Sequence, residues 1–127
     1  MKKLKNLLLN KKKQQSIPPI PTIEEIAEEL YNKSLSFEDY EVIKVINNKD
    51  KTKRFILLKS SNGFYKYTYE EIYVYDADEW NLCCNIPDSY PATWIPKDRK
   101  FAYSFFGTEK EAYTSMKQES EYLQYFE

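Results

Sequence analysis

Residues 69–80 combine acidic and large aromatic side chains, the two residue types in this sequence with the clearest chemical uses. The members are Tyr69, Glu70, Glu71, Tyr73, Tyr75, Asp76, Asp78, Glu79 and Trp80. Paired carboxylates can carry out acid–base hydrolysis, and clustered carboxylates can hold a magnesium or calcium ion. The run from Asp76 to Glu79 superficially resembles the start of a calcium-binding loop, but it lacks the glycine and the twelfth-position glutamate of such a loop.

The rest of the composition argues against catalysis. The chain has no histidine and only two glycines. Histidine is the usual general base near neutral pH and the commonest metal ligand, and glycine lets a backbone close around phosphate. None of the patterns GxxxxGK[ST], GxGxxG, HExxH or GxSxG occurs. We therefore predict that the protein is not an enzyme and uses no metal and no cofactor.

The acidic and aromatic residues are suited to binding another protein. Tyrosine and tryptophan supply rigid contact area and dominate interface hot spots, and nearby carboxylates attract a basic partner. No basic residue lies between Lys66 and Lys97. The alternatives are a solvated charged face for the acids and core packing for Tyr67 and Tyr69. The predicted partner-binding residues are Glu70, Glu71, Tyr73, Tyr75, Asp76, Asp78, Glu79 and Trp80.

The net charge of −1 conceals two segments of opposite charge. Residues 1–13 hold six lysines and no acid, which leaves 13 basic and 20 acidic residues, a net charge of −7, in the remainder. Such a leader could lie on a membrane surface or contact nucleic-acid phosphates, but it is short and contains neither arginine nor an aromatic residue. A frayed, solvated terminus is the more typical outcome. We expect neither a membrane nor nucleic acid as a partner.

Three prolines in residues 14–21 predict an extended connector, because proline fixes the backbone and removes a donor. We expect residues 1–21 to be a basic flexible leader with this connector, and residues 22–127 to be a single domain. The leucines at 7–9 are too few for a signal peptide, and no apolar run approaches the roughly 20 residues of a membrane span. Adjacent Cys83 and Cys84 are poorly placed for a disulfide. We therefore expect reduced thiols and a cytoplasmic protein.

Helical patterns occur near both ends of this predicted domain. Apolar residues recur at helical spacing from Ile23 to Tyr31, and a second helix follows Gly107. Each begins at a capping-box pattern, in which a threonine precedes a glutamate by three positions. The two capping pairs are Thr22 with Glu25 and Thr108 with Glu111. The apolar face predicted for the second helix consists of Ala112, Met116 and Leu123.

Strand patterns occur at residues 40–47, 54–60, 64–74 and 101–106, and residues 77–98 are expected to form a long, irregular but structured connection. The pair Asn62-Gly63 predicts a two-residue hairpin turn. That turn sets a register in which Ile56 and Leu58 face Tyr69 and Tyr67 on the core side. An unbroken third strand would then bury Glu71, so we predict a bulge near Glu70–Glu71 that turns Tyr73 and Tyr75 outward.

These elements predict an α+β domain: an antiparallel sheet of about four strands, with the N- and C-terminal helices packed on one face. Three stretches resemble small uncharacterised α+β domains of lysine- and asparagine-rich bacterial chains, and the last looks like several immunity proteins of bacterial toxin systems. The stretches are Lys59-Ser-Ser-Asn-Gly-Phe-Tyr, Pro91-Ala-Thr-Trp94 and Phe105-Phe-Gly-Thr-Glu-Lys-Glu-Ala112. The resemblance assigns no functional residue.

With the acidic and aromatic surface, this resemblance leads us to expect a cytoplasmic binding protein that neutralises a protein partner, such as a basic toxin, by occluding it. The mechanism would be steric and electrostatic. The alternative is a non-catalytic structural or accessory domain that assembles through its sheet edge or its basic leader. The sequence does not indicate the oligomeric state.

Overall fold

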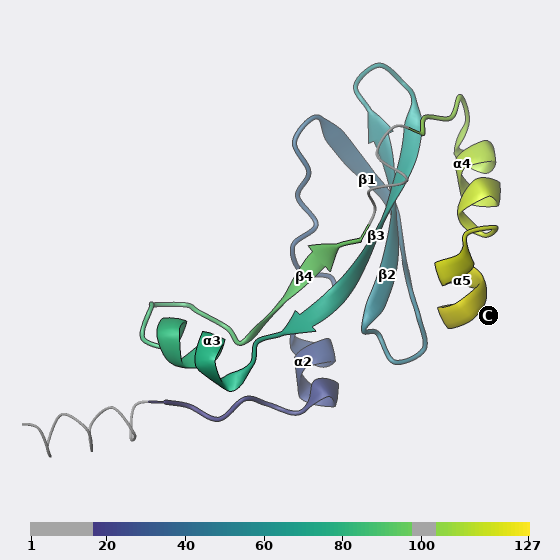
Figure 1. Cartoon of the computed structure of the whole chain (residues 1–127). Coiled ribbons are helices and arrows are strands. Elements are labelled where there is room, and N and C mark those ends of the chain that lie inside the picture. The colour runs from purple at the N-terminus through teal and green to yellow at the C-terminus, as the bar shows by residue number, and fades with distance from the viewer. Residues whose placement is uncertain (1–16, 98–103) are drawn as a thin grey trace, which may run out of the picture.

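The computed structural model describes residues 17–97 and 104–127, so most of the predicted basic leader lies outside the described residues. The four strands form one antiparallel sheet in the order β1-β2-β3-β4. The predicted class, α+β with a four-stranded antiparallel sheet and N- and C-terminal helices, is confirmed (Figure 1). The elements are α2 (Ile23–Glu29), β1 (Tyr40–Asn47), β2 (Lys53–Ser60), β3 (Tyr65–Val74), α3 (Ala77–Cys83), β4 (Ala92–Pro96), α4 (Glu109–Met116) and α5 (Ser120–Tyr125).

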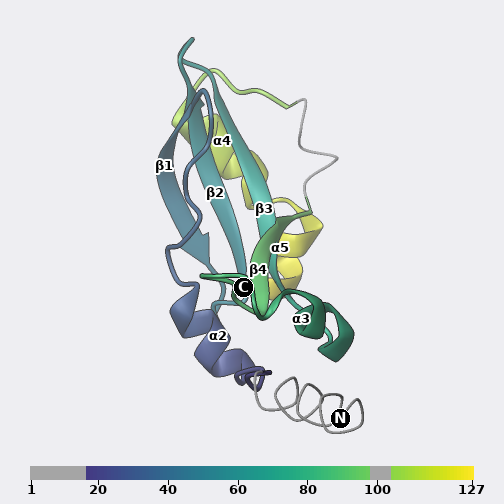
Figure 2. The same cartoon turned by 90° about the vertical axis from the view of Figure 1, so that its left-hand side faces the viewer.

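Helices α4 and α5 cover one face of the sheet, as Figure 2 shows. The Phe55 ring lies at the centre of this layer, with its centroid 4.8 Å from that of Tyr69 and 5.1 Å from that of Phe126. Burying one such side chain stabilises the fold by roughly 1.5–3 kcal/mol. The buried cluster consists of Phe55, Leu57, Tyr67, Tyr69, Ala112 and Met116.

The opposite face of the sheet is covered by the segment that follows α2. The Arg54 side chain is fully buried there and donates to the carbonyl oxygens of Lys33 and Ser34, at 2.8 and 3.2 Å. The Trp94 indole donates to the Leu30 carbonyl at 2.9 Å. The prediction placed the N- and C-terminal helices on one face, whereas this N-terminal segment packs against the face opposite α4 and α5.

The predicted register of the β2–β3 hairpin is wrong by one residue. The loop has three residues, 61–63, and is closed by a 2.7 Å hydrogen bond from the Ser60 amide to the Phe64 carbonyl. Gly63 has a φ of +85°, and Asn62 has no positive φ, so this is not the two-residue turn in which both central residues need positive φ. A type I turn followed by a left-handed glycine fits three-residue loops.

The shift of one residue exchanges the two faces of β2, because successive side chains point to opposite sides. Phe55 and Leu57, and not Ile56 and Leu58, oppose Tyr69 and Tyr67 on the face covered by α4 and α5. The error is easy to make because β2 is buried on both faces, from Arg54 through Leu58.

The predicted bulge near Glu70–Glu71 is also wrong. Pairing between β2 and β3 is regular as far as Lys53 and Glu71. Within the described sheet, the register shift lies in β1, between Val42 and Lys44. No bulge is needed, because Glu71 is only half-buried and its carboxylate accepts from the Tyr69 hydroxyl at 2.7 Å.

Residues 77–98, predicted to be irregular, contain both α3 and β4. β4 is the fourth strand, and its Trp94 opposes Ile72 of β3. Residues 101–103 of the predicted strand 101–106 lie outside the described residues. Residues 104–106 form no regular strand, but Phe106 makes an isolated bridge to Tyr65.

The single C-terminal helix of the prediction is two helices. The Thr108 side chain accepts from the Glu111 amide at 3.1 Å, as expected of a cap. Ala112 and Met116 are fully buried as predicted, but Leu123 is 52% exposed, because the chain breaks after Met116 and α5 turns other side chains inward. Within residues 17–97 and 104–127 the helices have six to eight residues, and none could cross a membrane.

Candidate functional site

The predicted site residues lie at the end of β3 and in and just before α3, and all but Glu70 and Glu71 belong to a projection that we call the arm (residues 72–93). Pairing of β3 with β2 stops at Glu71, whereas pairing with β4 continues to Val74. Beyond the main sheet the arm is therefore a two-stranded ribbon that ends in α3. Figure 1 shows α3 at the far end of this projection, with the chain before α2 running beside it.

Glu70 is an internal residue, which corrects its prediction as a steering charge. Its side chain is only 10% exposed, and its Oε1 accepts from Arg54 Nε at 2.8 Å and lies 2.7 Å from Arg54 Nη2. The Arg54 guanidinium also lies 4.0 Å from the centroid of the Trp94 ring. A carboxylate neutralised in this way contributes almost nothing to a field outside the protein.

Trp80 is also internal, which corrects its prediction as an interface anchor. The residue is 5% exposed, and its indole Nε1 donates to the Pro18 carbonyl at 2.7 Å. A buried indole requires such an acceptor. Trp80 therefore attaches the proline-rich connector to α3, across 62 residues of sequence.

Asp76 and Glu79 begin helix α3 by capping it reciprocally. The Asp76 carboxylate accepts from the Glu79 amide at 2.8 Å, and the Glu79 carboxylate accepts from the Asp76 amide at 2.9 Å. The Tyr73 hydroxyl donates to the same Glu79 oxygen at 2.6 Å, and this hydrogen bond raises the Tyr73 pKa. These three residues are brought together, but primarily to hold α3 on the end of β3.

The remaining predicted residues differ in exposure. Glu71 is half-buried and accepts from the Tyr69 hydroxyl at 2.7 Å. Tyr75 is half-buried, with its ring 6.0 Å from that of Tyr73, and Asp78 is exposed. Of the eight predicted residues, Tyr73, Asp76 and Asp78 are exposed, so the surface is smaller than the sequence indicates.

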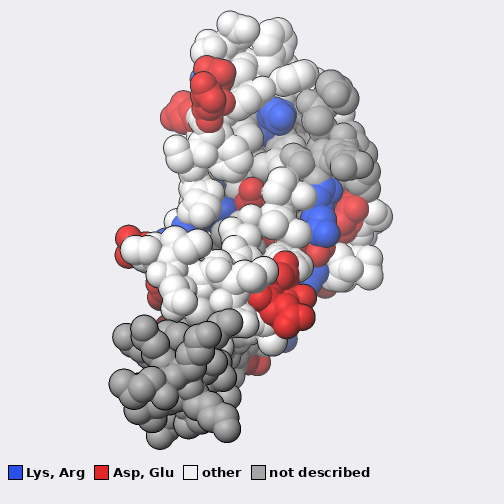
Figure 3. All heavy atoms as spheres, turned by 60° about the vertical axis from the view of Figure 1, so that its left-hand side comes forward, with Lys and Arg blue, Asp and Glu red and all other residues white. Residues whose placement is uncertain are grey.

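The acidic residues do not form one continuous field. Figure 3 shows Asp and Glu side chains in several separate groups on the face it presents, with Lys and Arg side chains between some of them. A basic partner would therefore be attracted to particular acidic groups and not to the whole face.

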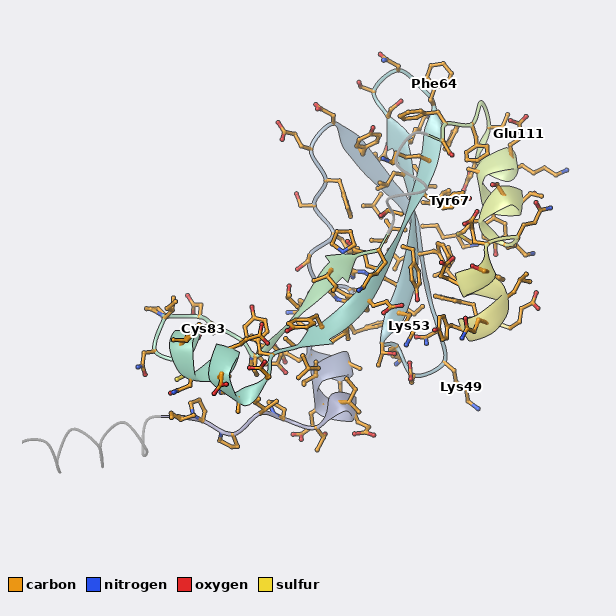
Figure 4. All side chains as sticks on the ribbon, viewed as in Figure 1. Lys49, Lys53, Phe64, Tyr67, Cys83 and Glu111 are labelled. Atoms are coloured by element: carbon orange, nitrogen blue, oxygen red, sulfur yellow. The ribbon has the colours of Figure 1, made fainter. Side chains whose placement is uncertain are left out.

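Sequence reasoning missed the most exposed large apolar residues of the arm. Leu82 on α3 is 86% exposed, and Ile86, which follows the helix, is 60% exposed, although Trp80 on α3 is buried. Cys83 and Cys84 between them are half-buried free thiols. Figure 4 shows Cys83 near the outer end of the arm, far from Glu111 on α4. The Asp76-x-x-Glu79 spacing is itself a helix-start signal that could have identified α3.

No group of three or more His, Cys, Asp or Glu side chains suited to a metal ion occurs in the described residues. The tight polar contacts of the arm are capping and anchoring bonds, and they leave Leu82 and Ile86 exposed.

No family model, curated protein or solved structure matches this chain. Any functional conclusion therefore depends on the geometry of the arm and the surfaces beside it.

Proposed function

We propose that this protein is a non-catalytic, cytoplasmic binding protein that occludes a basic protein partner, in the manner of an immunity or antitoxin-like factor, and that the arm is its binding surface. The observation that carries the proposal is the exposure of Leu82 on α3 and of Ile86 just after α3, in a segment that is anchored through Trp80. Single exposed aliphatic residues are ordinary on protein surfaces, but two of them within five residues at the tip of a projection are suited to contact with a partner, and we call them the patch.

The anchoring makes the patch suitable for tight binding. The arm is fixed by the Trp80–Pro18 bond, the Asp76–Glu79 cap and the Tyr73–Glu79 bond. A surface held in its binding conformation loses little entropy on association. Burying a side chain such as that of Leu82 contributes roughly 1.5–3 kcal/mol.

The charge beside the patch favours a basic partner. The first turn of α3 carries Asp78 and Glu79 after the cap residue Asp76, and no basic residue lies in its last turn. Carboxylates at the rim of an apolar patch accelerate association with a cationic protein and lower its affinity for acidic ones.

Assembly through the sheet edge is less well supported. β1 is an edge strand, but it has a register shift at Val42/Lys44, and Glu41 and Lys44 are exposed on it. Bulges and charged residues are devices that prevent edge strands from pairing with other chains.

The proposal is tested by changing the patch without changing the fold. The double variant Leu82→Ser, Ile86→Ser is compared with Leu123→Ser, which alters an exposed leucine on α5. A partner captured from the source cells by the full chain is purified, and its Kd is measured for each variant by calorimetry. We expect the double variant to lose about 2 kcal/mol of binding, roughly 30-fold in Kd, and the control less than about threefold. Equal loss in both, or no loss in the double variant, would refute the proposal.

A further inference from the structure

Two surface depressions adjoin at Tyr90 and Pro21, and we call them together the Tyr90 groove. The first, about 330 Å³, is lined by the proline connector, Trp80, Ile86 and Tyr90. The second, about 360 Å³, is lined by Pro21, Tyr90 and three glutamates of α2. The groove therefore has an apolar end beside the exposed patch of the arm and an acidic end on α2. The three glutamates are Glu25, Glu28 and Glu29.

The acidic end has unused carboxylates. One carboxylate oxygen of Glu25 accepts from Thr22 in the cap, whereas the carboxylates of Glu28 and Glu29 are exposed and make no hydrogen bond or ion pair with the described residues. Neither Lys nor Arg is among the described residues that line the two depressions. Burial, followed by the charges of Glu29 and Glu25, raises the pKa of Tyr90, so this ring carries a neutral phenol beside the acids.

We propose that the Tyr90 groove receives an extended basic segment of the protein partner, with an aliphatic side chain at the Trp80–Ile86 end and a lysine or arginine beside Tyr90, Glu28 and Glu29. This inference rests on the proposed function and names the element of the partner that is recognised. A basic side chain has an apolar stem that packs on proline and aromatic surface, and a charged head that the carboxylates and the ring face attract.

The direction of the connector favours a segment of the partner over the chain's own lysine-rich leader. Residues 17–21 form a wall of the groove, and Figure 1 shows them leading from α2 toward α3, away from the acidic end. The lysines of residues 1–13 precede this wall in sequence. To reach Glu28 and Glu29, the leader would have to reverse and run antiparallel to its own connector.

The test measures binding of three fluorescein-labelled octapeptides to the full chain by fluorescence anisotropy in 50 mM salt. The peptides alternate leucine with lysine, serine with lysine, or leucine with glutamate. We expect the leucine–lysine peptide to bind most tightly and the leucine–glutamate peptide not to bind. The double variant Glu28→Gln, Glu29→Gln should weaken the leucine–lysine peptide at least tenfold, and Tyr90→Ala at least fivefold, whereas Tyr90→Phe should retain binding.

The matched control removes two charges elsewhere. Glu38→Gln with Glu109→Gln changes two exposed acids outside both depressions and should alter the affinity less than twofold. If the control weakened peptide binding as much as Glu28→Gln with Glu29→Gln, the peptide would be attracted only by the net charge of the protein. That result would overturn the proposed site. A tenfold gain in peptide affinity on replacing Lys11, Lys12 and Lys13 by glutamine would assign the groove to the leader and would also overturn it. If the purified partner binds normally to the Glu28→Gln, Glu29→Gln variant but not to Leu82→Ser, Ile86→Ser, the groove fails and the proposed function stands.

Discussion

The sheet body and the arm use the same residue types in opposite ways. In the body, Leu57 is fully buried and Tyr67 is 3% exposed, because α4 and α5 cover the face they occupy. In the arm, Leu82 is 86% exposed and Tyr73 is 38% exposed, because the ribbon beyond Glu71 has no such cover. The body is thus held together by apolar burial, and the arm by polar caps and one indole–carbonyl bond. An element that is stabilised without burying its aliphatic residues leaves them available to a partner.

The largest expected effect is in the body. Glu70→Ala leaves the fully buried Arg54 guanidinium without its carboxylate, which should lower the free energy of unfolding by about 3–5 kcal/mol. Asp78→Ala, in the arm, should change it by less than about 0.5 kcal/mol. Urea unfolding followed by circular dichroism measures both. Similar values for the two variants would mean that the buried pair does not distinguish the body from the arm.

The junction between the arm and the connector should show the next largest effect. Trp80→Ala removes a buried indole and its bond to Pro18, and should cost roughly 3 kcal/mol, whereas Leu82→Ala should be close to neutral. Thermal unfolding and limited proteolysis near residues 17–21 report both the stability and the release of the connector. If Leu82→Ala proves as harmful as Trp80→Ala, Leu82 is packed in solution and the patch does not exist.

The hairpin at the other end of the body provides a smaller, purely conformational test. A Cβ at Gly63 would meet nothing within 4 Å, so only the φ of +85° opposes a side chain there. Gly63→Val should therefore destabilise the protein by about 1–3 kcal/mol, and Gly63→Asn by clearly less, because asparagine tolerates this region. Equal melting temperatures for the two variants would contradict the positive φ at Gly63.

The smallest effect is expected at the start of α3. Asp76→Ala removes the carboxylate that accepts from the Glu79 amide and should cost about 1 kcal/mol. Asp76→Asn, which keeps an acceptor, should cost less than half of that. Hydrogen exchange of the α3 amides separates local fraying from global loss. A global loss as large as that of Trp80→Ala would show that the cap supports more than the arm.

Local patterns in the sequence predicted much of the fold. The cap at Thr22, the strands β1 and β2, and the hairpin after β2 depend on neighbouring residues, and each is present. The hairpin register was missed because the Asn-Gly signal does not distinguish a two-residue loop from a three-residue loop. The assignment of side chains to the two faces of the sheet then failed because β2 is apolar on both sides. Only the position of Arg54 indicates that the face opposite α4 and α5 is also covered.

The site was less predictable because its residues are fixed by distant partners. Glu70 is paired with Arg54, 16 positions earlier, and Trp80 with Pro18, 62 positions earlier. The residues that neighbour Glu70 and Trp80 in the sequence give no signal of either contact. Both were therefore assigned to a surface from which the fold removes them. Asp76 and Glu79 are the opposite case, since their spacing is a local signal for a helix.

Hydrogen exchange of the full chain, measured with and without its purified protein partner, tests the central claim most directly. If the arm is the binding surface, amides of residues 77–90 should become protected at least tenfold on binding, and those of the β1 edge, residues 40–47, should not change. Protection confined to residues 40–47, with none in α3, would contradict the account and assign binding to the sheet edge.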